Sequence, residues 1–266
     1  MSQPMILVQG LTRRFGSLAA VDALDLSVQS GVIFGLLGRN GAGKTTLIKM
    51  LTTLLPPSEG SARIAGFDIV TQASMVRRVI GYVPQALSAD GELTGYENLL
   101  VFCKLFDVPR RERAQRIEEA LEFMGLSDAA HKLVKSYSGG MIRRLEIAQS
   151  TLHRPRLLFL DEPTVGLDPL ARHAVWQHVE RLKARYNSTI LLTTHYMDEA
   201  DRLCEEVAIL NHGRLVAQGA PTQLRGELGP GATLDDVFAR YTGDMREQSE
   251  RYDEISRARR TAERLR

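Results

Sequence analysis

The sequence is poor in cysteine and has no dominant charge. It contains two isolated cysteines in 266 residues, Cys103 and Cys204, and its 34 basic and 32 acidic residues leave a formal net charge of +2. Two isolated cysteines give neither a disulfide framework nor a thiolate metal site, and they are typical of a reducing compartment. A chain with so little net charge has no general basic field to attract nucleic acid, so we expect no nucleic-acid partner.

Long apolar segments are also missing. The longest apolar runs, VIFGLLG at 32–38 and LLFL at 157–160, are far shorter than the roughly 18 residues that span a bilayer. The chain opens on the strand-like MILVQ, without the regions of a signal peptide, so we expect none. Hydrophobic residues make up 44% of the chain, enough for one sizeable core, or for one core plus a helical lobe. If the protein serves a membrane, we expect it to act from outside the lipid.

Short apolar runs alternate with helical patterns along the chain. Those at 32–37, 157–161 and 189–194 are apolar throughout, which is typical of parallel strands covered on both faces. Residues 5–28 are more typical of a small antiparallel edge. Further strands are predicted at 80–83, 207–210 and 214–217, and helices at 94–106, 110–124 and 139–153.

Residues 38–46, GRNGAGKTT, match the pattern G-x-x-x-x-G-K-[ST] of a phosphate loop. The glycines let backbone N–H groups surround a phosphate, the lysine reaches the terminal phosphates, and the threonine hydroxyl ligates Mg²⁺. The loop lies between an apolar strand and a helical pattern, the order that this chemistry requires; the alternative is an ordinary strand-to-helix turn. The predicted nucleotide-binding residues are Gly38, Arg39, Asn40, Gly41, Ala42, Gly43, Lys44, Thr45 and Thr46.

Two adjacent carboxylates, Asp161 and Glu162, end the apolar strand of RLLFLDEPTVGLDP at 156–169. Open α/β sheets bind ligands at that edge. We predict that Asp161, with Thr45, belongs to a Mg²⁺ shell and that Glu162 is the general base, while Lys44 stabilises charge on the γ-phosphoryl group. The alternative is an acidic pair that only ends a strand before a proline. Asp168 fits a helix N-cap, and a functional role can coexist with capping.

A second glycine-rich helix start lies at 136–144, SYSGGMIRR. Ser138 is a natural N-cap, so the N–H groups of Gly139, Gly140 and Met141 form the positive end of a helix and can face an anion. Taken alone, this is a plain N-cap. Because the chain already has a phosphate loop, the position of this segment relative to the other motifs decides its meaning.

The motifs, in their order, resemble those of the ATP-binding subunits of ABC transporters. The resemblance runs from residue 5 to 243 and implies ATP and Mg²⁺ as cofactors. It also implies an α/β fold, in which a P-loop NTPase (RecA-like) core has a mainly parallel sheet, an N-terminal antiparallel β edge and an inserted α-helical lobe. The motifs are the phosphate loop, YVPQ at 82–85, YSGGM at 137–141 (the signature segment), LLFLDEP at 157–163, GLDP at 166–169 and LLTTH at 191–195.

The same resemblance divides the chain. An ATPase domain would cover residues 1–243, with its core at about 1–85 and 157–243 and the helical lobe at about 86–156. The remainder, 244–266, is dominated by Arg, Glu and Asp at spacings that pair along a helix, so we predict a charged helical tail. A solvated helix and a docking surface for a partner are both open interpretations of that tail.

In this family two cassettes dimerise head to tail, and each ATP lies between one phosphate loop and the partner's signature segment. The resemblance therefore implies that Ser138, Gly139, Gly140 and Met141 contact ATP held by a second copy of the chain, with Asp168 in the adjoining D-loop.

Three more positions gain a role only from the resemblance. Gln85 resembles the glutamine of the ATP site that contacts Mg²⁺ or water and reports the nucleotide state to the membrane subunit. His195 resembles the switch histidine that contacts the γ-phosphate and orients the base. Phe15 resembles the aromatic residue that stacks on adenine. The alternatives are a loop glutamine, a surface histidine and a core phenylalanine. The remaining histidines, including His153 and His178, have no predicted role.

The segments YSGGM, TTHYMDEA and TLDDVFARYTG resemble exporters of the daunorubicin-resistance type. This implies a separate integral-membrane permease subunit, export of a drug, lipid or other amphiphile, and a peripheral position on the cytoplasmic face of the inner membrane. Tyr137 and Met141 depart from the usual Leu and Gln, but only the Met141 backbone needs to approach phosphate. The alternatives are an importer subunit, a soluble ATPase acting on nucleic acid or ribosomes, and a nucleotide-binding regulator without turnover.

Overall fold

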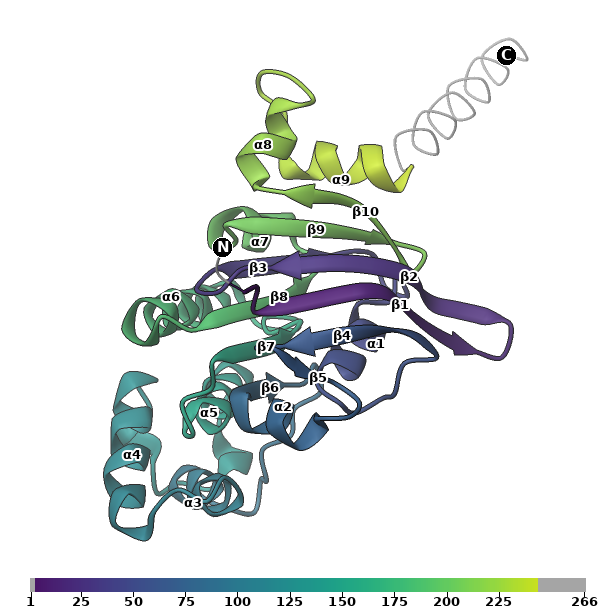
Figure 1. Cartoon of the computed structure of the whole chain (residues 1–266). Helices are drawn as coiled ribbons and strands as arrows, with labels where there is room; N and C mark the ends of the chain where they lie inside the picture. Colours follow the sequence, from purple (N-terminus) through teal and green to yellow (C-terminus); the bar gives the residue numbers. More distant parts are fainter. Residues whose placement is uncertain (1–2, 244–266) are drawn as a thin grey trace, which may run out of the picture.

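The computed structural model describes residues 3–243, which form two β-sheets with helices packed around them (Figure 1). The larger sheet has the strand order β10-β9-β3-β8-β7-β6, and every neighbouring pair is parallel except β10 with β9. This confirms the predicted α/β fold with a mainly parallel sheet. Its strands are β3 (Ile33–Leu37), β6 (Ile80–Val83), β7 (Leu157–Asp161), β8 (Thr189–Thr194), β9 (Glu206–Asn211) and β10 (Arg214–Gly219).

The central strands are buried on both faces because their apolar side chains alternate between two cores. Leu158 and Leu160 of β7 join the core formed with α5 (Gly139–Thr151), α6 (Pro169–Tyr186) and α7 (Met197–Leu203). Leu157 and Phe159 join the opposite core, which contains α1 (Lys44–Leu51) and the smaller sheet. The uninterrupted apolar runs in the sequence follow from this double coverage.

The smaller sheet is antiparallel, with strand order β2-β1-β4-β5. β1 (Ile6–Phe15) pairs with β2 (Leu18–Val28), which agrees with the antiparallel edge predicted over 5–28. β4 (Glu59–Ile64) and β5 (Phe67–Asp68), which were not predicted from the sequence, complete a separate sheet. Only Ala62 and Ile64 of β4 are buried, so the segment carries almost no strand signal.

The helical lobe contains α3 (Gly95–Leu105) and α4 (Arg110–Phe123), and α5 packs against both. These bounds agree with the predicted helices to within two residues. Thr94 and Glu97 form a capping box that starts α3, since each side chain bonds to the backbone N–H of the other. α2 (Ala73–Val79) was not predicted from the sequence, because it is a short helix with one buried residue.

The lobe and the C-terminal helices lie at opposite ends of the larger sheet (Figure 1). The lobe adjoins β6, while α8 (Pro221–Gly226) and α9 (Leu234–Thr242) adjoin β10. The predicted tail helix at 244–266 lies outside the described residues. Within 3–243, none of the helices is both long enough and apolar enough for a bilayer span. The domain boundaries drawn at 86 and 156 stay a prediction.

The buried His178 of α6 predicts a pH dependence of stability. Burial, with smaller effects from Arg144 and Arg181, lowers its pKa from 6.5 to about 4. Between these values the unfolded chain binds a proton that the folded chain excludes, so the contribution of His178 to stability falls as pH drops from 6.5 to 4. We expect a lower free energy of unfolding at pH 5 than at pH 7 in urea titrations. His178→Leu should reduce this difference, and an unchanged pH dependence would contradict the assignment.

Candidate functional site

Four strand ends place the candidate residues at one edge of the larger sheet. The strands β3, β8, β7 and β6 are consecutive neighbours and parallel, so their carboxyl ends lie side by side. The phosphate loop leaves β3, Glu162 follows β7, His195 follows β8, and Gln85 lies two residues beyond β6. This is the edge where open α/β sheets bind ligands.

The phosphate loop holds a left-handed backbone that needs glycine. Gly43 has φ +105°, and a Cβ there would lie 2.3 Å from the Ala20 carbonyl oxygen. The loop therefore curls against β2 with no space for a side chain. Lys44 begins α1 and is 4% exposed. Its Nζ donates hydrogen bonds to the carbonyl oxygens of Gly38 at 2.6 Å and Arg39 at 3.3 Å, so its charge lies inside the loop.

Asp161, the last residue of β7, is 1% exposed. Its Oδ1 accepts hydrogen bonds from the hydroxyls of Thr193 at 2.6 Å and Thr45 at 3.4 Å. Its Oδ2 is buried and has no hydrogen-bond partner among the described residues. The pKa of the nearby Tyr82 is raised to about 12, mainly by burial of its side chain and to a smaller extent by the charge of Asp161. The site therefore keeps one carboxylate oxygen available for a further ligand.

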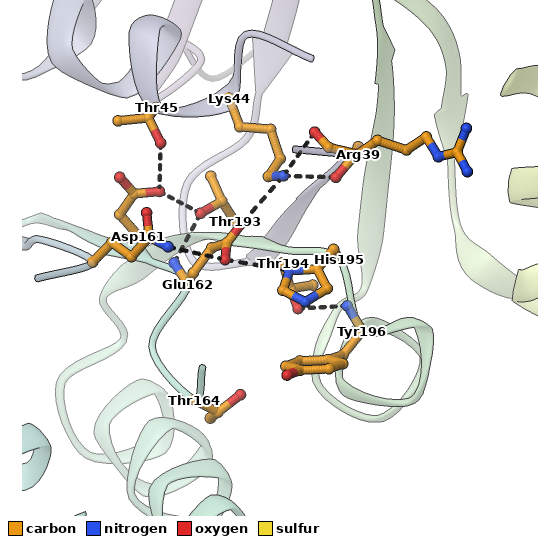
Figure 2. Close-up of polar contacts among 12 residues, drawn as sticks. Arg39, Lys44, Thr45, Asp161, Glu162, Thr164, Thr193, Thr194, His195 and Tyr196 are labelled. Carbon is orange, nitrogen blue, oxygen red and sulfur yellow. Dashed lines mark hydrogen bonds and ion pairs between the residues drawn. The ribbon is translucent and has the colours of Figure 1, made fainter. Parts of the chain in front are cut away.

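Glu162 lies at the centre of the site, and Figure 2 shows the side chains of Lys44 and His195 beside its carboxylate. Its Oε1 is 3.2 Å from Lys44 Nζ. Its Oε2 is 3.2 Å from His195 Nδ1 and 3.5 Å from Gln85 Nε2. The side chain is 6% exposed, so these contacts are weakly screened by solvent. The predicted base, switch histidine and glutamine therefore lie together.

The backbone of Glu162 is strained. Its φ of +48° lies in the left-handed region, which costs a non-glycine residue on the order of 1–3 kcal/mol. Its N–H donates to the Thr193 hydroxyl at 2.9 Å, and the same hydroxyl donates to Asp161. Thr193 therefore bridges the two acidic residues. Sequence reasoning missed Thr193 because it lies inside an apolar strand, and only the β7–β8 register places it opposite Asp161.

A cavity of about 250 Å³ lies between the phosphate loop and the acidic strand end. A neighbouring cavity of about 750 Å³ shares Arg39, Asn40 and Gly41 with it and reaches His195 and α9. The smaller cavity therefore contains most of the predicted ATP-binding residues. Its lining residues are Ala20, Arg39, Asn40, Gly41, Gly43, Lys44, Thr45, Thr46, Gln85 and Glu162.

Phe15 lies apart from both cavities. Its side chain is 49% exposed at the end of β1, and the Arg13 guanidinium lies 4.8 Å from its ring centroid. The core-phenylalanine alternative is therefore wrong. The stacking of Phe15 on adenine stays a prediction.

The signature segment also lies outside both cavities. Ser138 caps α5 by accepting a hydrogen bond from the Met141 N–H at 3.3 Å. Ser138 and Gly139 are exposed, while Gly140 is buried against Ala171 of α6. Asp168 caps α6 through the N–H groups of Leu170 and Ala171, which agrees with the predicted N-cap.

The donor set of the site fits Mg²⁺. This ion is usually held by one or two carboxylates and substrate phosphates, with several waters. The buried Asp161 Oδ2 lacks a partner, and the Thr45 hydroxyl lies on the other oxygen of the same carboxylate. Within residues 3–243, no cluster of three or more His, Cys, Asp or Glu side chains offers an alternative metal site.

Comparisons with known proteins agree with this geometry. A family model described as ABC transporter matches residues 21–165. The daunorubicin/doxorubicin resistance ATP-binding protein DrrA of Streptomyces peucetius is 46% identical over 224 residues, covering 84% of this chain and 68% of that protein. The Nod factor export ATP-binding protein I of Ralstonia nicotianae is 44% identical over 223 residues, covering 84% of this chain and 69% of that protein.

Solved structures extend the comparison to the fold. A structure described as the ATP binding subunit of an ABC transporter has a TM-score of 0.80 at 30% identity, covering 90% of this chain and 99% of that one. The structure of cbiO1 from Clostridium perfringens, described as part of the ABC transporter complex cbiONQ, has a TM-score of 0.78 at 25% identity, covering 85% of this chain and 92% of that one. The chain therefore belongs to the ATP-binding subunits of ABC transporters, which are ATP-hydrolysing transport enzymes.

Proposed function

We propose that two copies of this chain close around two ATP molecules and that hydrolysis powers export through a separate membrane subunit. The observation that carries the proposal is the convergence of Lys44, Gln85 and His195 on the Glu162 carboxylate. This arrangement joins a predicted base to a predicted phosphate-binding lysine at one cavity. It supports phosphoryl transfer to water.

Each residue then has a defined task. Glu162 accepts a proton from water while the water oxygen attacks the γ-phosphorus and the bond to the β–γ bridging oxygen breaks, giving ADP and phosphate. Lys44 stabilises the charge on the γ-phosphoryl oxygens. His195 contacts the γ-phosphate and orients the Glu162 carboxylate, from which its Nδ1 lies 3.2 Å.

Mg²⁺ would be held by Thr45, Asp161 and Gln85. When bound, it neutralises negative charge on the β- and γ-phosphate oxygens. The buried Asp161 carboxylate is oriented by the Thr193 hydroxyl, so its remaining oxygen is already directed for a ligand.

The nucleotide pocket is completed in trans. Ser138 and Gly139 are exposed on this chain and line neither cavity, which is what a surface that serves a partner's ATP requires. The free N–H groups at the start of α5 would donate to the γ-phosphate of the second copy. Asp168 would lie in the D-loop of the same interface, and Phe15 would stack on adenine.

Export is the direction that the relatives favour. The names of these two relatives refer to drug resistance and Nod factor export. We therefore propose a drug, lipid or other amphiphile as cargo, an integral-membrane permease as partner, and a peripheral position on the cytoplasmic face of the membrane. Exposed apolar side chains on the lobe and the preceding loop, Leu87, Val101 and Leu105, offer contact area for such a partner.

The proposal is tested first by phosphate release. The purified chain should release phosphate from ATP in the presence of Mg²⁺, and EDTA should abolish the release. Binding of ATP without release would favour a regulator without turnover.

A second experiment tests transport and requires the membrane partner. The tagged chain, expressed in its own host, should purify with a multispanning membrane protein. Inside-out vesicles carrying both should accumulate an amphiphilic dye in an ATP-dependent manner. ATP-dependent loss of the dye from these vesicles would favour an importer, and stimulation of ATPase activity by nucleic acid would favour the soluble alternative.

A further inference from the structure

Two buried charged side chains of α5 hold the loop that carries Gln85. Residues 84–89, here called the Gln85 segment, follow β6 and have no regular structure. Residues 85–88 are exposed, and the side chain of Gln85 reaches Glu162. An exposed segment without secondary structure has no hydrogen-bond ladder of its own to fix its position.

Arg143 of α5 supplies one half of the support. Its guanidinium donates to the carbonyl oxygens of Pro84 and Gln85, each at 2.7 Å. The two donors are the two terminal nitrogens of one planar fork, so the bonds fix both the position and the orientation of the Gln85 peptide. The side chain is 3% exposed.

Glu146, one turn along α5, supplies the other half. Its Oε1 accepts hydrogen bonds from the Ser88 N–H, from the Ser88 hydroxyl at 3.1 Å and from the Ala89 N–H at 3.3 Å. Its Oε2 lies 3.0 Å from the Arg143 guanidinium. The side chain is 2% exposed.

The direction of these contacts is informative. A buried ion pair is weak evidence for stability, because desolvation of both charges offsets their attraction. Here nearly all of the remaining hydrogen bonds of the pair go to the backbone of one segment, 57 to 59 residues away in the sequence. The pair therefore links the Gln85 segment to α5, the helix that Ser138 caps.

Two neighbouring contacts extend this link. The Ser150 hydroxyl donates to the Tyr82 carbonyl oxygen at 3.1 Å, at the end of the same helix. Gln149 donates to Asn98, and Asn98 in turn bonds to the backbone of Asp90. α5 therefore contacts the chain before, within and after the Gln85 segment.

We propose that Arg143 and Glu146 are positioning residues that make the Gln85 segment and the signature segment move as one body. Docking of the signature segment on a partner's nucleotide then sets the position of Gln85 at the nucleotide of its own chain. The two sites of the dimer are thereby coupled through the interior of α5. This inference rests on the proposed ATP-sandwich dimer.

The first test needs no nucleotide. In Glu146→Gln, the amide replaces a charged acceptor by a neutral one and leaves Arg143 without its counter-charge. Hydrogen exchange at Ser88 and Ala89 should accelerate at least about tenfold, because the two N–H groups lose a charge-assisted acceptor. The matched control is Glu112→Gln, which breaks the Glu112–Arg116 pair of the same lobe without touching the segment. An unchanged exchange rate at Ser88 and Ala89 would show that Glu146 does not hold the Gln85 segment and would overturn the proposal.

The second test uses ATP in chains that also carry Glu162→Gln to prevent turnover. ATP with Mg²⁺ should protect both 138–141 and 85–89 from exchange when Glu146 is intact. With Glu146→Gln, protection at 138–141 should persist while protection at 85–89 is lost. Equal protection of both segments in that variant would overturn the coupling.

Arg143→Lys keeps a positive charge beside Glu146 but removes the two-pronged guanidinium donor. It is the substitute variant if Glu146→Gln folds poorly. In otherwise wild-type chains it should lower kcat about tenfold with ATP affinity within about twofold, because the phosphate loop is untouched. An unchanged kcat would contradict the positioning role. If residues 138–141 gain no protection even with Glu146 intact, the proposed ATP-sandwich dimer is contradicted. The exchange experiment without nucleotide still tests whether Glu146 holds the Gln85 segment.

Discussion

Replacement of Glu162 by glutamine is expected to lower kcat for ATP hydrolysis by about 10²–10⁴-fold, the usual contribution of a general base. Glutamine keeps the size of the side chain and can still contact Gln85 and His195, but it cannot accept the proton of the attacking water. The affinity for ATP should stay within a few fold, because the phosphate loop is intact. ATP with Mg²⁺ should then hold the chain as a dimer in size-exclusion chromatography.

The matched control is Glu205→Gln. Glu205 accepts a hydrogen bond from the Ile33 N–H at 3.1 Å, at the start of β3 and therefore at the opposite edge of the same sheet. The change removes the same charge far from the nucleotide, so kcat should stay close to that of the wild type. Phosphate release by Glu162→Gln at a rate near the wild type would reject Glu162 as the base.

Introduction of aspartate at Gly139 is expected to lower ATP hydrolysis by at least about 100-fold, as the loss of preorganised donors to a developing anion commonly does. A Cβ on Gly139 meets only Leu167 Cδ2, at an ordinary 3.5 Å, whereas one on Gly140 meets the Ala171 Cβ at 2.8 Å. Gly139→Asp therefore spares its own chain, and an acid in the first turn favours the helix. In the proposed dimer, the new carboxylate would instead face the partner's phosphates. Gly226→Asp, at an exposed position with open space, is the control.

Mixing experiments separate a composite site from a site within one chain. Lys44→Ala should also be inactive and bind ATP at least about tenfold more weakly, because it removes a charge-assisted contact to phosphate. In a dimer of Lys44→Ala with Gly139→Asp, one site carries both defects and the other carries neither. An equal mixture should regain up to about a quarter of the wild-type activity, since half of the randomly paired dimers are mixed and each has one intact site. Coupling between the two sites would lower this value but keep it above that of either variant alone.

Native mass spectrometry can verify that mixed dimers form in the presence of ATP. A mixture no more active than its two components, with mixed dimers present, would contradict the composite site. Full activity of Gly139→Asp by itself would contradict a role of the signature segment in trans.

The local parts of the candidate site could be predicted from the sequence because each depends on consecutive residues. A phosphate loop needs glycines, a lysine and a threonine at fixed spacing, so residues 38–46 can be recognised without a fold. The Asp161–Glu162 pair ends an apolar strand, and Ser138 precedes a helix, for equally local reasons. The apolar runs identified β3, β7 and β8 because these strands are buried on both faces. Strand β4 was not predicted because only two of its residues are buried, so it has no continuous apolar run.

Other features depend on which strands become neighbours, and no local pattern contains that information. The hydroxyl of Thr193 bridges Asp161 and Glu162 only because β8 lies beside β7 in the observed register. The sequence left open whether Phe15 is a core or a surface residue. It is exposed because it lies at the end of β1, where the β1–β2 hairpin turns.

The sequence by itself thus determined the phosphate chemistry of this protein, because the reacting groups lie on short contiguous motifs. The tertiary structure alone decided which motifs lie in contact with one another. Arg143 and Glu146 look like ordinary helix charges in the sequence, and they contact the Gln85 segment only after α5 packs against the end of β6. Such contacts join residues far apart in the chain, so their geometry is set by packing rather than by spacing.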